Sequence, residues 1–330
     1  MTRTLILGGT AWLGREIAKQ LVARGADVTC LARGEAGQFA RGVTSIRSDR
    51  RAAGAYDAVT GDWDEVIELS YDSDLVAGAL EAVADSAKHW TLVSSVSVYT
   101  SNTEPDADEA AAVFEPTDPA DYGHAKVAAE RATAAALGDR LLIVRPGLIV
   151  GPGDPTDRFG YWASRFALVA NEPVLVPEAD GRAAQIIDVR DLAGWLIDAG
   201  DHGLTGVVNA VGRQRDFGVV LAAAAVVAGF SGELVSATDE WLAAHGVNYW
   251  AGPRSLPLWL PRRDNAFAQR GRSALLAAGC TERMLAQTLA DVLADERTRG
   301  LDRVRRAGLT RAEEALLLAT LRASRARRAD

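Results

Sequence analysis

Apolar runs and amphipathic segments alternate along the first two-thirds of this 330-residue chain. The opening segment reads as a buried strand over 4–7, a glycine-containing turn, an amphipathic helix that ends near Gly25, and a second strand over 27–31. Further strand patterns, most of them separated by helical patterns, occur at 43–46, 66–69, 90–94, 141–144 and 207–210. This alternation predicts an α/β fold with a parallel sheet covered by helices on both faces.

The pattern changes after about Pro152, where the chain becomes richer in Pro, Trp and loop signals. We expect a smaller, mostly helical lobe there, and a strand near Val207 that returns to the first domain. The predicted boundaries are 1–151 and about 183–213 for the first domain, and about 152–182 and 214–330 for the lobe. Thr310 and Glu313 have the spacing of a capping box and predict the start of a last helix.

Composition and charge exclude several classes of protein. Lys and Arg number 36 and Asp and Glu 44, a formal charge of −8 that disfavours nucleic-acid binding through bulk charge. The longest apolar stretch, 219–230, is shorter than the roughly 20 residues that span a bilayer. No signal-peptide pattern precedes the first strand, so we expect a cytoplasmic protein. Two distant cysteines and four scattered histidines predict neither a disulfide framework nor a metal site.

A glycine-rich turn joins the first strand to the first helix. Residues 8–14 read GGTAWLG, and a turn that brings its backbone against a pyrophosphate needs residues with little or no side chain. The following helix offers free N–H groups and its positive dipole end to phosphates. The pattern therefore predicts a dinucleotide site, although a tight structural connection would look alike. The turn residues expected to bind the cofactor are Gly8, Thr10, Ala11, Trp12, Leu13 and Gly14.

The end of the second strand bears on the choice of cofactor. An unphosphorylated adenosine ribose is usually held by an Asp or Glu at this point, whereas this chain has Leu31, Ala32 and Arg33. A guanidinium there would pair with a 2′-phosphate, so we expect NADP(H) in preference to NAD(H). Asp49, after the third strand, is placed to accept a hydrogen bond from the adenine amino group.

A tyrosine and a lysine four residues apart lie in a predicted helix. Asp118 is a good N-cap and Pro119 a good first residue, so the helix is expected over 119–137, stopped by Gly138. Tyr122 and Lys126 then share one face. With six Tyr and three Lys in the chain, about 0.05 pairs of this spacing are expected by chance.

The chemistry of such a pair explains the spacing. An ammonium within roughly 4 Å at an effective dielectric constant near 20 favours a phenolate by about 4 kcal/mol, while desolvation acts in the opposite direction. Tyr122 could then exchange a proton with a carbonyl or hydroxyl oxygen. Ser95, at the carboxyl end of a predicted buried strand, is our choice as donor to that oxygen, with Ser94 and Ser97 as alternatives.

Six segments occur in the order LILGGTAWLG, Asp49, LVSSVSVY, YGHAK, VRPGLIVGPGD and QIIDVRDLA across about the first 200 residues. Together they resemble the extended short-chain dehydrogenases/reductases, the NAD-dependent epimerase/dehydratase family. The resemblance implies a doubly wound Rossmann domain, a C-terminal substrate lobe and a Ser-Tyr-Lys triad on Ser95, Tyr122 and Lys126.

The resemblance also implies further cofactor contacts. The counterpart of Lys126 hydrogen-bonds the nicotinamide ribose, the turn containing Leu69 and Ser70 approaches the bridging phosphates and ribose, and Pro146 lies along the nicotinamide. Family members often dimerise through the helix that carries the tyrosine, so a homodimer is expected.

Two positions depart from the family's pattern. Ala11 stands where the family has a glycine, a change of one methyl group. Val96 and Ser97 follow Ser95 where the sugar 4,6-dehydratases carry Asp-Glu, and valine can act neither as an acid nor as a base. Dehydration by that route is therefore not expected.

The sequence thus predicts an enzyme, an oxidoreductase that transfers a hydride between NADP(H) and a keto or hydroxyl carbon of a small molecule, with a nucleotide sugar as one option. A nucleotide-sugar 4-epimerase that retains NAD needs the same triad and stays open. A non-catalytic dinucleotide-sensing or RNA-binding relative is the alternative from another class, and the intact Tyr-Lys pair and the negative charge argue against it.

Overall fold

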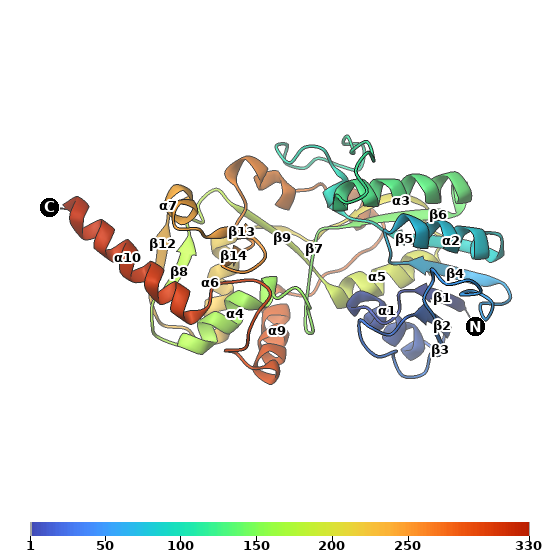
Figure 1. The fold of residues 1–330 in the computed structure, drawn as a ribbon, viewed down its shortest axis with the longest axis horizontal. Helices are drawn as coiled ribbons and strands as arrows, with labels where there is room; N and C mark the ends of the chain where they lie inside the picture. Colours follow the sequence, from blue (N-terminus) through green and yellow to red (C-terminus); the bar gives the residue numbers. More distant parts are fainter. Residues whose placement is uncertain (1, 330) are drawn as a thin grey trace. The chain divides into compact units, whose positions relative to one another are not determined.

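The computed structural model describes residues 2–329, and the chain forms two compact units (Figure 1). The first unit comprises Met1–Ile149, Ile186–Arg213 and Arg270–Glu282, and the second comprises Val150–Gln185, Gln214–Gln269 and Arg283–Asp330. Residues 270–282, which the sequence placed in the C-terminal lobe, therefore belong to the first unit. The reason is packing, because Leu275 of α8 (Ser273–Ala277) is fully buried in a core of that unit.

The first unit contains a seven-stranded sheet with the order β10-β6-β5-β4-β1-β2-β3, in which every neighbouring pair is parallel. This is the doubly wound order, with β1 at the point where the sheet changes direction. The strands are β1 (Arg3–Leu7), β2 (Asp27–Ala32), β3 (Thr44–Arg47), β4 (Trp63–Glu68), β5 (Ala87–Val93), β6 (Leu141–Pro146) and β10 (Gly206–Ala210). The predicted parallel α/β sheet is confirmed, with strand ends shifted by up to three residues.

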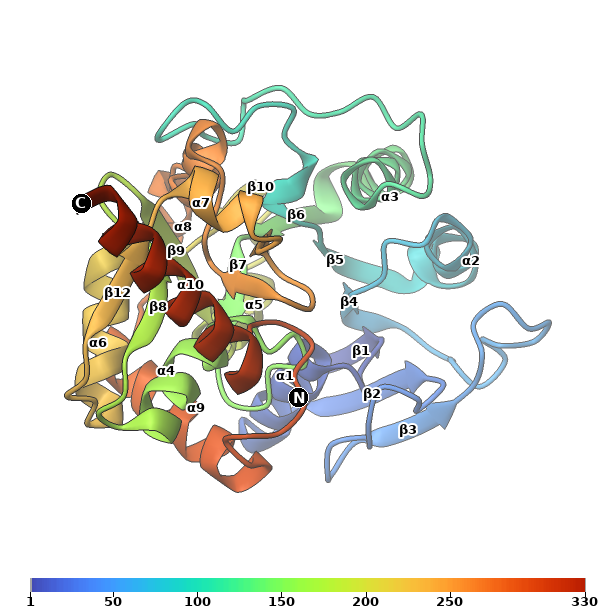
Figure 2. The ribbon, with the colours of Figure 1, turned by 60° about the vertical axis from the view of Figure 1, so that its left-hand side comes forward.

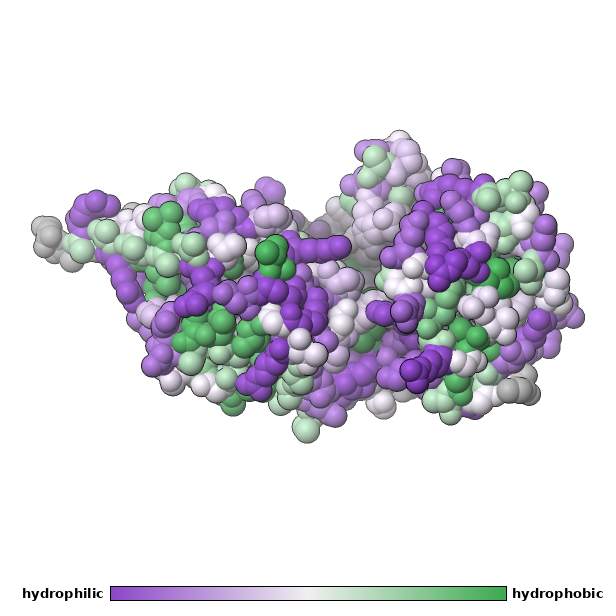
Figure 3. Space-filling model, turned by 60° about the horizontal axis from the view of Figure 1, so that its bottom comes forward, coloured by the Kyte–Doolittle hydropathy of each residue, from purple (hydrophilic) through white to green (hydrophobic). Residues whose placement is uncertain are grey.

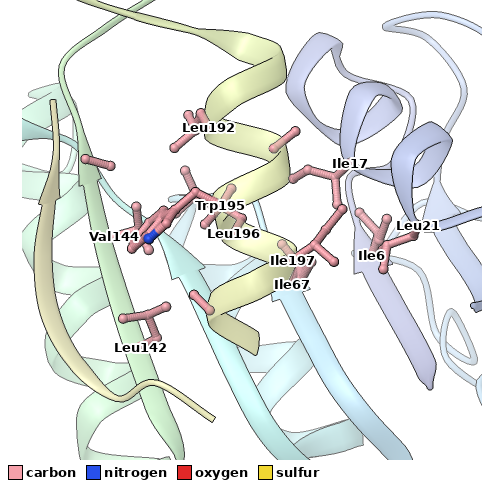
Figure 4. Packing of buried hydrophobic residues seen from close by; sticks show 14 of the residues in the cluster. Ile6, Ile17, Leu21, Ile67, Leu142, Val144, Leu192, Trp195, Leu196 and Ile197 are labelled. Atoms are coloured by element: carbon pink, nitrogen blue, oxygen red, sulfur yellow. The ribbon is translucent and has the colours of Figure 1, made fainter. Parts of the chain in front are cut away.

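Helices cover both faces of this sheet (Figure 2). They are α1 (Trp12–Ala23) and α5 (Val189–Asp201) on one face, and α2 (Ser73–Val83) and α3 (Tyr122–Leu137) on the other. Alternate strand residues enter the two cores, since Leu142 and Val144 pack on the α5 side and Leu141 and Ile143 on the α3 side. Figure 4 shows Leu192, Trp195 and Leu196 of α5 packed against Val144 and Leu142.

Short 3₁₀ turns complete the first unit, at η1 (Ala84–Ser86), η2 (Val96–Val98) and η3 (Gly138–Arg140). The helix that carries the tyrosine and lysine begins at Tyr122, so the predicted start at Pro119 was wrong. Asp121 is the N-cap and accepts from the N–H groups of Gly123 and His124, at 2.8 and 3.1 Å. Asp118 instead closes a preceding turn by accepting from the N–H of Ala120.

The second unit takes most of its regular structure from helices. These are α4 (Arg158–Val169), α6 (Phe217–Ala228), α7 (Asp239–Ala244), α9 (Leu285–Arg299), α10 (Arg311–Ala329) and the 3₁₀ segment η4 (Arg262–Ala268). Its strands form short pairs, β8 (Val174–Pro177) with β12 (Leu234–Ala237), β13 (Asn248–Trp250) with β14 (Ser255–Pro257), and β11 (Gln214–Asp216) with the start of β9 (Ala183–Asp188). The strands β7 (Leu148–Val150) and β9 lie where the chain passes between the units.

The predicted capping box at the last helix is confirmed. The Thr310 N–H donates to the Glu313 carboxylate at 2.8 Å, and the Glu313 N–H donates to the Thr310 hydroxyl at 3.2 Å.

On the face drawn in Figure 3, hydrophobic residues lie in separate patches among hydrophilic ones. Among residues 2–329, no helix is both long enough and apolar enough to cross a membrane.

Candidate functional site

The turn between β1 and α1 is built for close approach of a ligand to the backbone. Gly8 has a φ of +104°, which only glycine adopts readily, and a Cβ on Gly14 would lie 2.7 Å from the carbonyl oxygen of Gly8. Helix α1 begins after Ala11 with no side-chain cap and no acidic residue in its first turn. By contrast, α2, α3 and α5 are each capped by an aspartate. The N-cap of α1, Ala11, therefore offers no side-chain acceptor to the first turn, unlike the N-cap aspartates of the other three helices.

Seven of the predicted cofactor residues line one cavity of about 200 Å³ in the first unit, namely Gly8, Thr10, Ala11, Arg33, Asp49, Leu69 and Ser70. Leu31, Ala32 and Arg50 complete much of its wall. The cavity is smaller than the roughly 300–1,000 Å³ of pockets that enclose whole drug-sized ligands. Its size suits one end of a dinucleotide, and the uncapped helix beside it suits a phosphate.

Charges at the mouth of this cavity are exposed. The Arg33 guanidinium lies 3.3 Å from the Glu35 carboxylate, and the two side chains are 51% and 72% exposed. Asp49 accepts from the N–H of Arg51 at 3.1 Å, and its side chain is also exposed. The sequence analysis did not consider Glu35, which gives the cavity lining a second acid, besides Asp49, close to the guanidinium of Arg33.

Tyr122 and Lys126 come together at the carboxyl end of β5. The Lys126 Nζ lies 5.8 Å from the centre of the Tyr122 ring and 4.9 Å from the centre of the Tyr71 ring, and the two rings meet edge to face at 5.0 Å. The ammonium donates to the carbonyl oxygen of Val93, the last residue of β5, at 2.7 Å. Lys126 is buried whereas the Tyr122 side chain is 45% exposed, so the phenol can reach a ligand.

Ser95 follows the same strand two residues after Val93. Its backbone is extended, and its hydroxyl oxygen accepts from the N–H of Ser97 at 3.1 Å, which leaves the hydroxyl proton to donate elsewhere. Ser94 is engaged differently, because its hydroxyl donates to the buried carboxylate of Glu130. Of the two serines at the strand end, Ser95 is the one whose proton is not committed to that carboxylate.

Burial lowers the pKa of Lys126 from its usual value of 10.5 to about 8. The negative charges of Glu68 and Glu130 act in the opposite direction and raise it. At neutral pH the ammonium form is therefore retained, in a position where its charge is poorly screened by water. Such an ammonium favours the ionised form of a nearby phenol.

Glu130 belongs to a buried network that the sequence analysis missed. It lies one turn after Lys126 on α3, and Arg145 of β6 donates to both of its oxygens, at 3.0 and 2.7 Å. Arg145 also donates to the Tyr99 hydroxyl at 3.0 Å, and that hydroxyl donates to Asn209 at 2.7 Å. The spacing of Tyr122, Lys126 and Glu130, four residues apart each time, was a usable signal for it.

A second buried carboxylate, Glu68, ends β4 beneath the cavity. Arg50 donates to both oxygens of the Glu68 carboxylate and to the carbonyl oxygen of Leu75. The Ser70 N–H also donates to the Glu68 carboxylate, at 2.8 Å. The Glu68–Arg50 pair therefore ties together two walls of the cavity, the turn after β3 and the turn after β4. The signal in the sequence was an acid directly after the apolar pair Val66 and Ile67, at the end of the strand.

The remaining predicted residues lie outside the cavity lining. Trp12, Leu13 and Gly14 belong to the first turn of α1, and Pro146 is the last residue of β6. Tyr122 and Lys126 lie at the strand-end site around Val93 described above. Within the first unit, the predicted residues therefore lie in the cavity lining, at the end of β5, in the first turn of α1 and at the end of β6.

Comparisons with known proteins agree with this architecture. The model of the NAD dependent epimerase/dehydratase family matches residues 4–212. A dTDP-6-deoxy-L-talose 4-dehydrogenase (NAD(P)(+)) from Kitasatospora kifunensis is 30% identical over 178 residues, in a match that spans 46% of this chain and about half, 54%, of that relative.

Solved structures show the same fold. RMD from Pseudomonas aeruginosa, complexed with NADPH, has a TM-score of 0.65 at 20% identity, with 91% of this chain and all of that chain covered. The UDP-glucose 4-epimerase of Thermus thermophilus, in complex with NAD, has a TM-score of 0.62 at 19% identity, with 90% of this chain and 99% of that chain covered. The segment that matches the family model, residues 4–212, includes the glycine turn, the helix that carries Tyr122 and the seven strands of the sheet. The chain therefore belongs to the NAD-dependent epimerase/dehydratase family of enzymes, which use a nicotinamide dinucleotide.

Proposed function

We propose that this protein is an NADP(H)-preferring oxidoreductase that acts on a keto or hydroxyl carbon of a small molecule of the nucleotide-sugar class. The observation that carries the proposal is the pairing of a buried lysine with an exposed tyrosine at the end of β5, beside Ser95. Two relatives support it, since one is a dTDP-6-deoxy-L-talose 4-dehydrogenase and the other, RMD, was solved with NADPH.

The roles of the three residues follow from their surroundings. Ser95 has a hydroxyl proton to donate to the substrate oxygen, and Tyr122 exchanges a proton with that same oxygen. The Lys126 ammonium, held by the Val93 carbonyl, is proposed to stabilise the tyrosinate and to donate to the cofactor ribose. A nicotinamide dinucleotide held by these residues would supply or accept the hydride.

The cofactor site is proposed to extend over the cavity and the start of α1. Gly8, Thr10, Ala11, Trp12, Leu13 and Gly14 form the phosphate turn, Leu69 and Ser70 border it, and Asp49 and Pro146 take the adenine and nicotinamide ends. Arg33, exposed in the cavity lining, is proposed to pair with a 2′-phosphate.

Tyr122→Phe tests the assignment. NADPH-linked reduction of dTDP- and UDP-4-keto sugars by the variant is expected to fall by about 100- to 10,000-fold, because general acid catalysis is lost, while NADPH binding is retained. Arg131→Gln, an exposed change on the same helix, is the control and should keep full activity. Undiminished turnover by Tyr122→Phe would refute the acid/base role.

A 4-epimerase that retains NAD is the second candidate, and Glu35 is the observation that favours it. A carboxylate in the cavity lining could accept from the two hydroxyls of an unphosphorylated ribose. The two candidates differ in what co-purifies with the protein. Tightly held NAD after purification, with interconversion of UDP-sugar epimers and no external cofactor, would establish the epimerase.

A further inference from the structure

One aromatic ring lies against both members of the candidate acid/base pair. Tyr71 belongs to the turn between β4 and α2, and the centre of its ring is 4.9 Å from the Lys126 Nζ. This is within the roughly 6 Å at which a cation is attracted to an aromatic face. The same ring meets the Tyr122 ring edge to face, with centres 5.0 Å apart and an angle of 80° between the planes. Tyr71 is therefore a shared neighbour of the phenol and the ammonium.

The turn that carries Tyr71 is held on both sides of this residue. The Ser70 N–H donates to the Glu68 carboxylate at 2.8 Å, and the Asp72 N–H donates to the Ser70 hydroxyl at 3.2 Å. Asp72 is also the N-cap of α2, and its carboxylate pairs with Arg51. These contacts fix the backbone before and after Tyr71, so a structured turn presents its ring to the end of β5.

The other groups that act on the Lys126 ammonium come from three elements. Glu68 ends β4 and Glu130 lies one turn further along α3, and the negative charge of each raises the pKa of Lys126. The Val93 carbonyl of β5 accepts from the ammonium at 2.7 Å. Lys126 is only 3% exposed, so little water screens its charge. The attraction between the ammonium and the Tyr71 ring is stronger under these conditions than it would be in water.

The ring acts on the ammonium in two opposite ways. It is part of the cover over Lys126, and burial lowers the pKa of this lysine from 10.5 to about 8. The negative face of the ring also attracts the charged form, which raises the pKa. An aromatic residue can therefore exclude water from the ammonium and still stabilise its charge, whereas an aliphatic residue of similar size only excludes water.

We propose that Tyr71 is a positioning residue for the acid/base pair, whose ring keeps the Lys126 ammonium charged in a site without water and holds the Tyr122 ring at a fixed angle. The inference rests on the proposed function, since it concerns the same pair. Tyr71 acts through Lys126 and Tyr122 and needs no contact with the substrate. The property required at residue 71 is an aromatic face, so phenylalanine should replace tyrosine and an aliphatic residue should not.

The pKa of Lys126 can be measured without any turnover. The chain contains three lysines, Lys19, Lys88 and Lys126, so ¹³C NMR of the full chain labelled at the lysine Cε atoms gives three signals. The signal that disappears in Lys126→Met belongs to Lys126, and its change with pH gives the pKa. The signal of Lys88 is the internal control, because this lysine is exposed and pairs with Asp64.

Three substitutions of Tyr71 test the need for an aromatic face. Tyr71→Phe should keep the wild-type pKa of Lys126. Tyr71→Leu and Tyr71→Met keep most of the bulk without the aromatic face, and each should lower this pKa by about one pH unit. Tyr71 is 43% exposed, so the variants are expected to fold, and the second aliphatic variant serves if the first does not. An unchanged pKa in the aliphatic variants, or an equal fall in Tyr71→Phe, would overturn the proposal.

Activity in the same variants separates this inference from the proposed function. At pH 8, NADPH-linked reduction of 4-keto sugars should fall by about fivefold in Tyr71→Leu, because the charged fraction of Lys126 falls from about one half to about one tenth. Tyr71→Phe should keep the wild-type rate and pH profile. An inactive wild type would count against the proposed function, and the titration of Lys126 would then decide alone on Tyr71. An active wild type with an unchanged rate and pH profile in Tyr71→Leu would overturn the positioning role.

Discussion

The two ends of the candidate site in the first unit differ in how their charges are surrounded. At the cavity mouth Arg33 and Glu35 are exposed to water, where a pair of charges contributes little to stability. At the end of β5 the charges of Lys126, Glu130 and Glu68 are buried, and each depends on a partner. A substitution at the exposed end should therefore change stability little, whereas a single substitution at the buried end should change stability or activity strongly.

Removing one member of the buried set should have the largest effect on stability. Glu130→Gln leaves Arg145 charged and unpaired, so the free energy of unfolding should fall by about 3–5 kcal/mol in urea denaturation. Glu115→Gln is the matched control, because Glu115 pairs at the surface with Arg131, which lies on the same helix as Glu130, and its loss should change stability little. Similar losses in both variants would remove the contrast between the two ends.

The pKa of Lys126 gives the next largest expectation. Its folded value of about 8 lies below the unfolded value of 10.5, so the unfolded chain binds more protons between these pH values. The lysine's contribution to the free energy of unfolding should therefore rise from pH 8 to 10.5, by about 3 kcal/mol in total. The measurement is the difference between wild type and Lys126→Met across this range, since other groups also titrate there. A difference that does not vary with pH would contradict it.

The same substitution separates stability from activity. At pH 7 Lys126→Met removes the cost of a buried charge but leaves the Val93 carbonyl without its donor, so a net gain of about 2 kcal/mol is expected. Hydride transfer should be lost at the same time. Lys88→Met, at a fully exposed lysine, should change neither quantity by much. A destabilised Lys126→Met protein would mean that the hydrogen bond outweighs the desolvation.

How much of this could be predicted depends on whether a feature is local in the sequence. The strands, the glycine turn and the Tyr122–Lys126 spacing follow from periodicity and local motifs, and the structure has the sheet and the spacing as expected. The partners of Glu130 and Glu68 lie 15 and 18 residues away on other elements, so the chain order alone does not pair them. The helix start was wrong because Asp118 and Asp121 are both good caps, and only tertiary packing selects one.

The smallest effect is expected at the exposed end. Arg33→Gln removes the proposed partner of a 2′-phosphate but leaves the fold unchanged, so NADPH binding should weaken by about tenfold, close to 1.4 kcal/mol, while NADH binding changes little. Arg33→Asp should go further and favour NADH, because it places a second carboxylate beside Glu35. Fluorescence titration of each variant with both cofactors measures the ratio, with Arg41→Gln, an exposed arginine outside the cavity, as control. If the ratio of NADPH to NADH affinity stays at its wild-type value in both Arg33 variants, the Arg33 guanidinium takes no part in cofactor choice. Glu35 is then the next residue to substitute.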